Sequence, residues 1–313
     1  MITGSRNLEF YINDINYKVD LIQKVDSDPS KVQIIIPTFM PNKNAQNITR
    51  VCIESVQKYT DYPYNLWLID NCSPKKHLEW FLENEYLNIA RNLIEPVAPK
   101  YRRISQTFKL FHRNKVGKVG LQAQDASYAN SIGLEIGIRL LSKDTKYVFT
   151  MHSDTLVLKN AWLTYLMSKL NDQTRAISCW KDAIRVNALH IGGMLFDFQL
   201  YERFKMNFFH NINNSRNADM PEYDVGDLIT IRLLENGFKV MNCRNTYNEP
   251  ELQEKIPLNN PLKKLHSDRC FDDNWNLFYA HLGRGAPKSF GTYNKEGKTN
   301  PEQWTKFAEK YVI

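Results

Sequence analysis

The stretch Tyr147-Val-Phe-Thr-Met-His-Ser-Asp-Thr155 decides the fold that we expect for this chain. Its first five residues are bulky or β-branched and predict a buried strand, which the polar triplet His152-Ser153-Asp154 brings to an end. In open α/β sheets, ligands bind in the crevice outside the carboxyl ends of the strands, so Asp154 is well placed to bind a metal. A strand-end Asp can equally cap the helix expected from about Asn160, and the triplet alone leaves both roles open.

The sequence before this strand alternates between strand and helix patterns. Three apolar runs have the length and composition of strands: 32–36, 65–69 and 108–112. Helices are expected after them in three segments: 47–59, 75–84 and 126–141. This alternation predicts an α/β fold with a doubly wound, mostly parallel sheet of the Rossmann-like type. We expect this half of the chain to bind a nucleotide.

The chain as a whole predicts one domain with additions at both ends. Residues 1–30 are interpreted as an N-terminal extension packed on the domain, and 286–313 as a C-terminal tail packed on it. The domain itself is expected to span 31–285. Within it, 31–155 form the nucleotide-binding half and 156–285 a smaller subregion.

Composition and charge narrow the classes of partner. With 313 residues, 42% of them apolar, the chain can bury a sizeable core. It has 41 Lys and Arg against 34 Asp and Glu, which gives a net charge of +7 and a pI near 9.0. Such a charge favours an anionic partner: a nucleotide, a nucleic acid or a membrane surface.

Cysteine usage and hydropathy predict the compartment. The five cysteines are odd in number and form no CxxC pair, so neither a disulfide framework nor a zinc knuckle is indicated. No apolar run approaches the roughly 20 residues that span a bilayer, and the first residues lack a signal-peptide pattern. We therefore expect a soluble protein of the cytoplasm, for which a peripheral contact with a membrane stays open.

Four acidic or histidine side chains lie at the ends of predicted elements. Asp70 follows the second strand and Asp154 the fourth, Asp224 opens a helix, and His281 precedes a glycine-rich turn. Each of them alone is more often structural than catalytic. Their joint arrangement is harder to explain by structure alone.

These positions resemble the motifs of the family 2 glycosyltransferases with a GT-A fold, and the resemblance runs from about 32 to 285. Ile34-Ile-Ile-Pro-Thr-Phe39 resembles the strand and loop that receive the nucleotide base in that family. Leu68-Ile-Asp-Asn-Cys-Ser73 resembles its "VDDGS" segment, and Ser127-Tyr-Ala-Asn130 resembles its "AxAxN" helix start.

The second half of the resemblance concerns the reacting groups. The triplet His152-Ser153-Asp154 stands in the place of the DxD motif, and Tyr223-Asp-Val-Gly-Asp-Leu228 in that of the "EDxDL" motif on the acceptor side. His281 stands in the place of a late metal-binding histidine. The resemblance implies an inverting, metal-dependent transferase, with 156–285 as its acceptor half.

The resemblance also implies a role for each matched residue. Asp154 and His281 would hold Mn²⁺ or Mg²⁺, and Mn²⁺ accepts an imidazole ligand more readily than Mg²⁺ does. The bound cation would stabilise the charge that develops on a nucleotide-diphosphate leaving group, expected to be UDP. Six further residues would bind the donor: Thr38, Asp70, Asn71, Asn130, His152 and Ser153. Lys118 or Arg113 would neutralise phosphate, although an exposed, solvated cation explains either residue as well.

Asp224 is the candidate general base, with Asp227 behind it. An acceptor hydroxyl must lose its proton as it attacks the anomeric carbon, and a carboxylate at a helix start on the acceptor side can take that proton. A plain N-cap is the alternative role for Asp224, since Asp is favoured at that position.

Three departures from the family pattern bear on these roles. His152 replaces the usual first Asp, so the triplet would contact ribose or metal through an imidazole or lose that contact. Tyr223 replaces a Glu, and Gly226 adds a residue between the two aspartates, which leaves the choice between Asp224 and Asp227 open. Asn71 replaces the second Asp of its segment.

The leading hypothesis is therefore a transferase that moves a sugar from a nucleotide donor to the hydroxyl of a carbohydrate or lipid-linked acceptor, as in surface polysaccharide or lipopolysaccharide synthesis. A dinucleotide or methyl-donor Rossmann enzyme is disfavoured, because Pro37-Thr-Phe39 stands where GxGxxG would follow the first strand. A catalytically degenerate module that binds sugar or nucleic acid is the alternative from another class.

Two further hypotheses concern the identity of the acceptor and a possible lid over the donor. Basic and aromatic residues after Gly237 allow a hydroxylated base in DNA as the acceptor, which would have to be flipped out of its stack. They are Lys239, Arg244, Tyr247, Lys263, Lys264 and Arg269. The polar composition of 211–221 suggests a lid over the donor.

Overall fold

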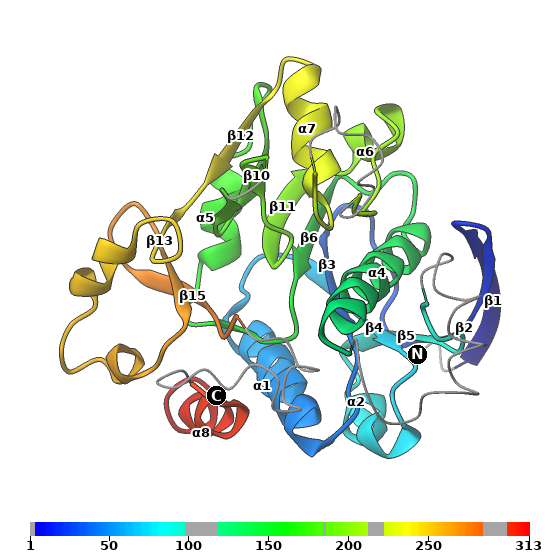
Figure 1. The fold of residues 1–313 in the computed structure, drawn as a ribbon, viewed down its shortest axis with the longest axis horizontal. Helices are drawn as coiled ribbons and strands as arrows, with labels where there is room; N and C mark the ends of the chain where they lie inside the picture. Colours follow the sequence, from blue (N-terminus) through cyan, green and yellow to red (C-terminus); the bar gives the residue numbers. More distant parts are fainter. Residues whose placement is uncertain (1–3, 98–117, 184–185, 212–221, 284–298) are drawn as a thin grey trace.

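The computed structural model describes residues 4–97, 118–183, 186–211, 222–283 and 299–313 (Figure 1). Its centre is a nine-stranded sheet with the order β1-β2-β5-β4-β3-β6-β11-β8-β12. The strands are β1 (Gly4–Ile12), β2 (Ile15–Gln23), β3 (Val32–Thr38), β4 (Tyr64–Asn71), β5 (Leu87–Asn92), β6 (Tyr147–Met151), β8 (Thr174–Ser178), β11 (Gly193–Asp197) and β12 (Lys239–Asn242). All run in one direction except β2 and β11, which are antiparallel to their neighbours.

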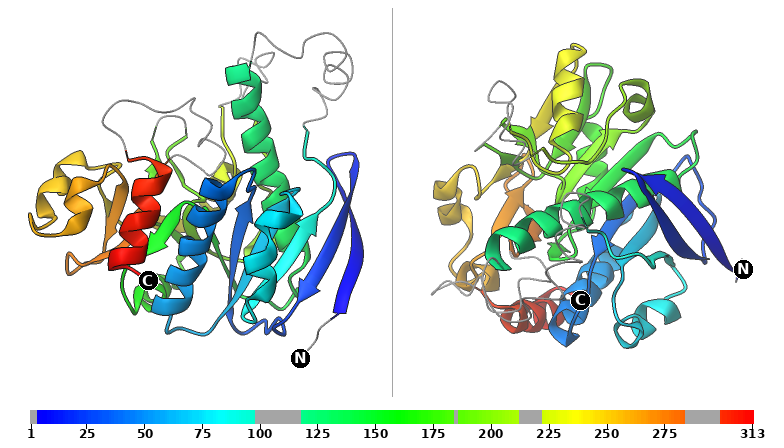
Figure 2. Two further views of the ribbon diagram at one scale, coloured as in Figure 1. Left: turned by 90° about the horizontal axis from the view of Figure 1, so that it is seen from below. Right: turned by 45° about the vertical axis from the view of Figure 1, so that its right-hand side comes forward.

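Helices cover both faces of this sheet (Figures 1 and 2). The helix α4 (Lys118–Arg139) packs on β3 and β4, while α1 (Lys43–Tyr59) belongs to the core on the opposite face. Two glycines let α4 come close to the sheet, since a Cβ at Gly133 or Gly137 would lie 2.9 Å from Pro37 or 2.8 Å from Ile35. The prediction of a doubly wound, mostly parallel α/β fold is confirmed.

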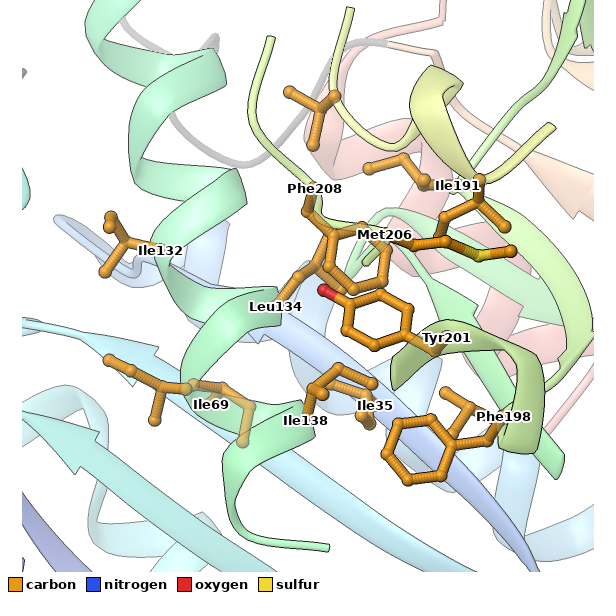
Figure 3. Packing of buried hydrophobic residues seen from close by; sticks show 14 of the residues in the cluster. Ile35, Ile69, Ile132, Leu134, Ile138, Ile191, Phe198, Tyr201, Met206 and Phe208 are labelled. Atoms are coloured by element: carbon orange, nitrogen blue, oxygen red, sulfur yellow. The ribbon is translucent and has the colours of Figure 1, made fainter. Parts of the chain in front are cut away.

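The core under α4 joins the two halves of the chain. Figure 3 shows Ile35 and Ile69 of the sheet on either side of Ile138 of α4. Aromatic residues of the second half, including Tyr201 of α6 (Gln199–Arg203) and Phe208, fill the space beside them. Burial of this continuous apolar surface is the main force that holds the two halves together.

The predicted deciding strand is β6, and the chain changes sheets directly after it. Residues Thr155–Val157 form β7, which belongs to a second, four-stranded sheet with the order β13-β14-β15-β7. The other strands of this sheet are β13 (Arg244–Asn245), β14 (Asp268–Phe271) and β15 (Leu277–His281). The polar triplet 152–154 therefore lies at the junction of the two sheets.

The N-terminal residues contribute more than an extension packed on the domain. β1 and β2 form an antiparallel hairpin, and β2 pairs with β5, so the hairpin enlarges the central sheet. Tyr17, Val19 and Leu21 of β2 are buried, whereas the residues between them are more exposed, as expected for a strand with one face on the core.

The third parallel strand differs from the expected one. β5, at Leu87–Asn92, pairs with β4, whereas the run 108–112 lies outside the described residues. β5 was not predicted, because its polar residues Asn88 and Asn92 are typical of loops. Both are fully buried and hydrogen-bonded inside the protein.

The remaining elements are short. They are α2 (Glu79–Glu83), α5 (Trp162–Ser168), α7 (Asp227–Glu235), α8 (Pro301–Tyr311), the strands β9 (Lys181–Asp182) and β10 (Ala188–Leu189), and the 3₁₀ turns η1 (Lys75–His77), η2 (Pro250–Lys255) and η3 (Pro261–Lys264). α8, within the expected C-terminal tail, packs on α1. Among the helices of the described residues, none has the length and apolar character needed to cross a bilayer.

Candidate metal and nucleotide site

The ends of several strands meet at the carboxyl edge of the central sheet. β11 is antiparallel to β6, so Gly193 at its start pairs with Met151 at the end of β6. β8 is antiparallel to β11 and ends at the same edge, just before Trp180. In the second sheet, His281 at the end of β15 pairs with Thr155 at the start of β7. The topology thus gathers the triplet, Trp180, the segment 190–193 and His281 at the carboxyl edge of the central sheet.

The backbone of the triplet is fixed by its neighbours. The His152 amide donates to the Gly192 carbonyl at 3.4 Å, and the Leu282 amide donates to the Asp154 carbonyl at 2.9 Å. The Thr155 hydroxyl closes the turn by donating to the His152 carbonyl at 2.7 Å. These contacts tie the turn to both sheets.

His152, Asp154 and His281 form a cluster that can hold a metal ion. The Nε2 atom of His281 lies 3.5 Å from Oδ1 of Asp154, and Nδ1 of His152 lies 4.0 Å from the same oxygen. One ligand atom from each residue falls within 4.8 Å of the others. Two ligands about 2.1 Å from a shared ion lie at most roughly 4.2 Å apart, so a small side-chain rotation would let all three bind one divalent cation. The structure thus brings together the predicted ligands Asp154 and His281, and adds His152 to them.

Electrostatics favour a cation at this position. The Asp154 side chain is only 1% exposed, and a buried carboxylate needs a nearby positive charge. Burial opposes the imidazolium form of His281, but Asp154 and Asp268 outweigh it and raise the pKa of His281 to about 9. A divalent cation carries twice the charge of the His281 imidazolium, so it would stabilise the Asp154 carboxylate more strongly.

Aromatic rings enclose the cluster. Trp180 stacks on His281 with ring centroids 4.6 Å apart and planes inclined by 17°, and the His190 ring lies 5.2 Å from both Trp180 and His152. Sequence reasoning missed Trp180 and His190. A signal was present in the pair of glycines after His190: a Cβ at Gly192 would come within 3.0 Å of the rings of His152, His190 and Trp180.

Asn130 and Ser153 also lie at this edge of the sheet. The Asn130 amide nitrogen is 3.4 Å from Nε2 of His152, so α4 contributes directly to the position of that imidazole. Ser153 is buried between two ligand residues. Both remain predicted donor-binding residues.

Asp70 lies two strands away, at the carboxyl end of β4. Its carboxylate accepts a hydrogen bond from the Ser73 amide at 3.2 Å and lies 3.7 Å from Nε of Arg91, its partner across the β4–β5 ladder. Burial raises the pKa of Asp70 to about 6, although the Ser73 hydrogen bonds and Arg91 oppose this shift. Sequence reasoning missed Arg91, which lay in the unrecognised strand β5.

Thr38 and Asn71, predicted to bind the donor, have structural partners. The Thr38 hydroxyl lies 3.2 Å from that of Thr49 in α1. The Asn71 amide donates to the Ala129 carbonyl of α4 at 2.8 Å, and its oxygen accepts from Asn92 at 3.2 Å. Both side chains are buried, so their contacts join the central sheet to helices and to β5.

Asp224 and Asp227 form a hydrogen-bonded turn before α7. The Asp227 carboxylate accepts from the Asp224 amide at 2.7 Å, and the Asp224 carboxylate accepts from the Val225 amide at 2.8 Å. Gly226 has φ of +80°, and a Cβ there would lie 2.1 Å from Ile191. The turn is thus packed against the segment that leads into Gly192 and the metal cluster.

Three predictions fall outside the described parts of the chain. They concern Arg113, the side chain of Lys118, and the lid, since 212–221 are among the residues that the structure does not describe. At its edge, Asn211 is paired with Tyr223 through hydrogen bonds of 3.0 Å and 2.6 Å.

Comparisons with known proteins find similarity in structure only. No family model matches the chain, and no curated protein matches it in sequence. Among solved structures, the chain is similar to the galactosyltransferase LgtC in complex with donor and acceptor sugar analogues, with 12% identity, 90% of this chain and 97% of that chain covered, and a TM-score of 0.47.

Two further solved structures are similar over much of the chain. One is the apo form of mouse xyloside xylosyltransferase 1, with 9% identity, 71% and 83% of the two chains covered and a TM-score of 0.39. The other is the apo form of the glycosyltransferase GlyE of Streptococcus pneumoniae TIGR4, with 8% identity, 89% and 60% covered and a TM-score of 0.41. At TM-scores below 0.5, these similarities do not assign an activity to this chain.

Proposed function

We propose that this chain is a metal-dependent glycosyltransferase of the GT-A type, which moves a sugar from a nucleotide-diphosphate donor, expected to be a UDP-sugar, to a hydroxyl group. The observation that carries the proposal is the cluster of His152, Asp154 and His281 at the carboxyl edge of a doubly wound sheet. A bound Mn²⁺ or Mg²⁺ would supply charge stabilisation for the leaving diphosphate. This is the edge at which such sheets bind nucleotides.

The protein's own residues have distinct parts in this proposal. Asp154, His152 and His281 hold the cation, and Asn130 fixes the His152 ring through the contact at 3.4 Å. Asp70 accepts hydrogen bonds from the base or the ribose. Its burial supports this role, because a carboxylate shielded from water forms stronger hydrogen bonds.

For the acceptor side we assign the general base to Asp224, with inversion at the anomeric carbon. The hydrogen bond from the Asp224 amide to the Asp227 carboxylate supports this choice, because it gives Asp227 a part in holding the turn. The Asp224 carboxylate accepts a hydrogen bond from the amide of the neighbouring Val225 through Oδ1, at 2.8 Å. The α or β configuration of the product, read by NMR against that of the donor, tests inversion.

A carbohydrate or lipid-linked acceptor is favoured over DNA. Between 239 and 283 the chain has six Lys and Arg residues and six Asp and Glu residues, so this segment carries no net positive charge. Arg269, one of the basic residues considered for DNA binding, is buried and donates to the carbonyls of Leu262 and Ser267. Phosphate backbones require clustered, accessible cations. A cytoplasmic location, with a peripheral membrane contact, remains part of this proposal.

A screen of nucleotide sugars tests the proposed activity. The protein is incubated with Mn²⁺ and each donor in turn, and release of the nucleoside diphosphate is measured. We expect one donor class to be hydrolysed slowly without an acceptor, and none after chelation of the metal. Absence of release with every donor, with intact folding, would favour the alternative of a sugar-binding module that has lost catalysis.

A further inference from the structure

The His281 imidazole is held on several sides, and one of the groups that hold it has no part in the proposal above. Asp268 in β14 is the ladder partner of His281 in β15, and its Oδ2 atom lies 3.0 Å from Nδ1 of His281. Trp180 covers one face of the ring at 4.6 Å. The contact with Asp268 thus rests on strand register and does not depend on a flexible loop.

This contact decides which nitrogen of the ring can serve as a ligand. When Nδ1 donates its hydrogen to the Asp268 carboxylate, Nε2 presents its lone pair in the direction of Asp154, 3.5 Å away. A carboxylate behind a ligating imidazole also makes the imidazole a stronger base. Both effects strengthen binding of a cation between His281 and Asp154.

The charge of the cluster gives Asp268 a second role. Two imidazoles and one carboxylate supply only one negative charge to a divalent cation, since His152 stands where a second carboxylate would complete a DxD triplet. Asp268 brings a second negative charge to the far side of the His281 ring. Its side chain is 26% exposed, so solvent screens this charge only in part.

We propose that Asp268 is the positioning residue of the metal site, which orients His281 through Nδ1 and supplies the negative charge that His152 does not. The inference rests on the proposed metal-dependent function. The turn after β15 begins beside this pair, where Gly283 adopts φ of +73°, a conformation that favours glycine. Asp268 does not touch the cation or the substrate in this account.

The test measures Mn²⁺ affinity of the metal-free protein by the EPR signal of the free ion. Asp268→Asn keeps the size of the side chain and removes its charge, and we expect Mn²⁺ affinity to fall about 10- to 100-fold. Asp273→Asn is the matched control. Asp273 lies in the turn that connects β14 to β15, and its carboxylate pairs with Lys169 and Tyr165 instead of with a proposed ligand. The control should change the affinity by less than about twofold.

A double-mutant cycle separates the charge of Asp268 from a general structural role. His152→Asp places a second carboxylate directly in the triplet. In that background, Asp268→Asn should weaken Mn²⁺ binding by no more than about threefold, because the missing charge is now supplied elsewhere. Asp268→Glu, which keeps the charge, should bind Mn²⁺ more tightly than Asp268→Ala, and this pair replaces the Asn variant if the latter folds poorly.

The Mn²⁺ affinities distinguish failure of the inference on Asp268 from failure of the proposed metal site. A folded Asp268→Asn protein that binds Mn²⁺ as tightly as the wild type would overturn this inference and leave the proposed function standing. If Asp268→Asn weakens Mn²⁺ binding as much in the His152→Asp background as in the wild type, Asp268 does not supply the missing negative charge. A wild-type protein that binds no Mn²⁺ would overturn the metal site itself, and the inference with it.

Discussion

The carboxyl ends of β4 and β6 lie two strands apart on the same sheet, yet they use their polar residues differently. At the end of β4, Asn71 joins α4 and β5, and Asp70 is anchored by Ser73 and Arg91. At the end of β6, His152 and Asp154 converge with His281 from another sheet. The first arrangement satisfies hydrogen bonds within the fold, whereas the second gathers possible ligand atoms within 4.8 Å of one another.

The difference shows that position at the edge of a sheet is not sufficient for a metal site. In the sequence, both segments resemble motifs of the same family and follow a predicted strand. What separates them is whether the neighbouring elements bring hydrogen-bond partners or further ligands. Four predictions test this contrast.

The largest effect is expected from the central carboxylate. Asp154→Ala removes the only carboxylate of the metal cluster, so nucleotide-sugar turnover should fall about 10³-fold or more and Mn²⁺ binding should be lost. Asp70→Ala, the matched change at the end of β4, should leave Mn²⁺ affinity unchanged. Equal loss of Mn²⁺ binding in both variants would remove the distinction between the two ends.

The second prediction concerns stability. Asn71→Ala leaves the Ala129 carbonyl and the Asn92 amide without their partner inside the protein, so the free energy of unfolding should fall by about 1–3 kcal/mol. Urea titration of the metal-free protein measures this change. If the stability of the variant matches that of the wild type while nucleotide binding is lost, Asn71 binds the donor and is not mainly structural.

The third prediction concerns the choice of metal. Two imidazoles beside one carboxylate suit Mg²⁺ poorly, because Mg²⁺ prefers oxygen ligands and retains its waters. We expect Mn²⁺ to bind about tenfold or more tightly than Mg²⁺, as measured by competition against the EPR signal of free Mn²⁺. His152→Asp should narrow this ratio, and a ratio unaffected by that change would argue against His152 as a ligand.

The smallest effect is the pH dependence caused by Asp70. Burial raises its pKa to about 6 in the folded protein, from 3.8, so the folded state holds this proton more tightly than the unfolded chain. The contribution of Asp70 to the free energy of unfolding should therefore rise as the pH falls from 6 towards 4. The difference between wild type and Asp70→Asn, followed by urea titration across this range, isolates it. An opposite slope would show that Arg91 and Ser73 dominate over burial.

Local patterns were sufficient to predict part of the fold and site. The deciding strand, β3, β4 and α4 have clear apolar signals in sequence, and the triplet that follows β6 supplies two of the three residues in the cluster that could hold a metal. The hairpin of β1 and β2 was missed even though β2 alternates buried and exposed residues, and β5 was missed because its buried asparagines look like loop residues.

The rest of the site depends on contacts between distant segments. Trp180 meets His281 only because β8 and β15 end at the same place, and Asp268 meets His281 through a ladder whose register shifts between Cys270 and Phe271. No local pattern contains that register. The same holds for Arg91, whose contact with Asp70 requires β5 to be recognised as the neighbour of β4.

The most direct test of the central claim is calorimetric titration of UDP into the wild-type protein with and without Mn²⁺, alongside Asp154→Ala. The account predicts binding that requires Mn²⁺ and disappears in the variant, because the diphosphate reaches the protein through a cation held by Asp154. Binding of equal strength without the metal, or in Asp154→Ala with it, would contradict the claim that the cluster at the end of β6 is the nucleotide-sugar site.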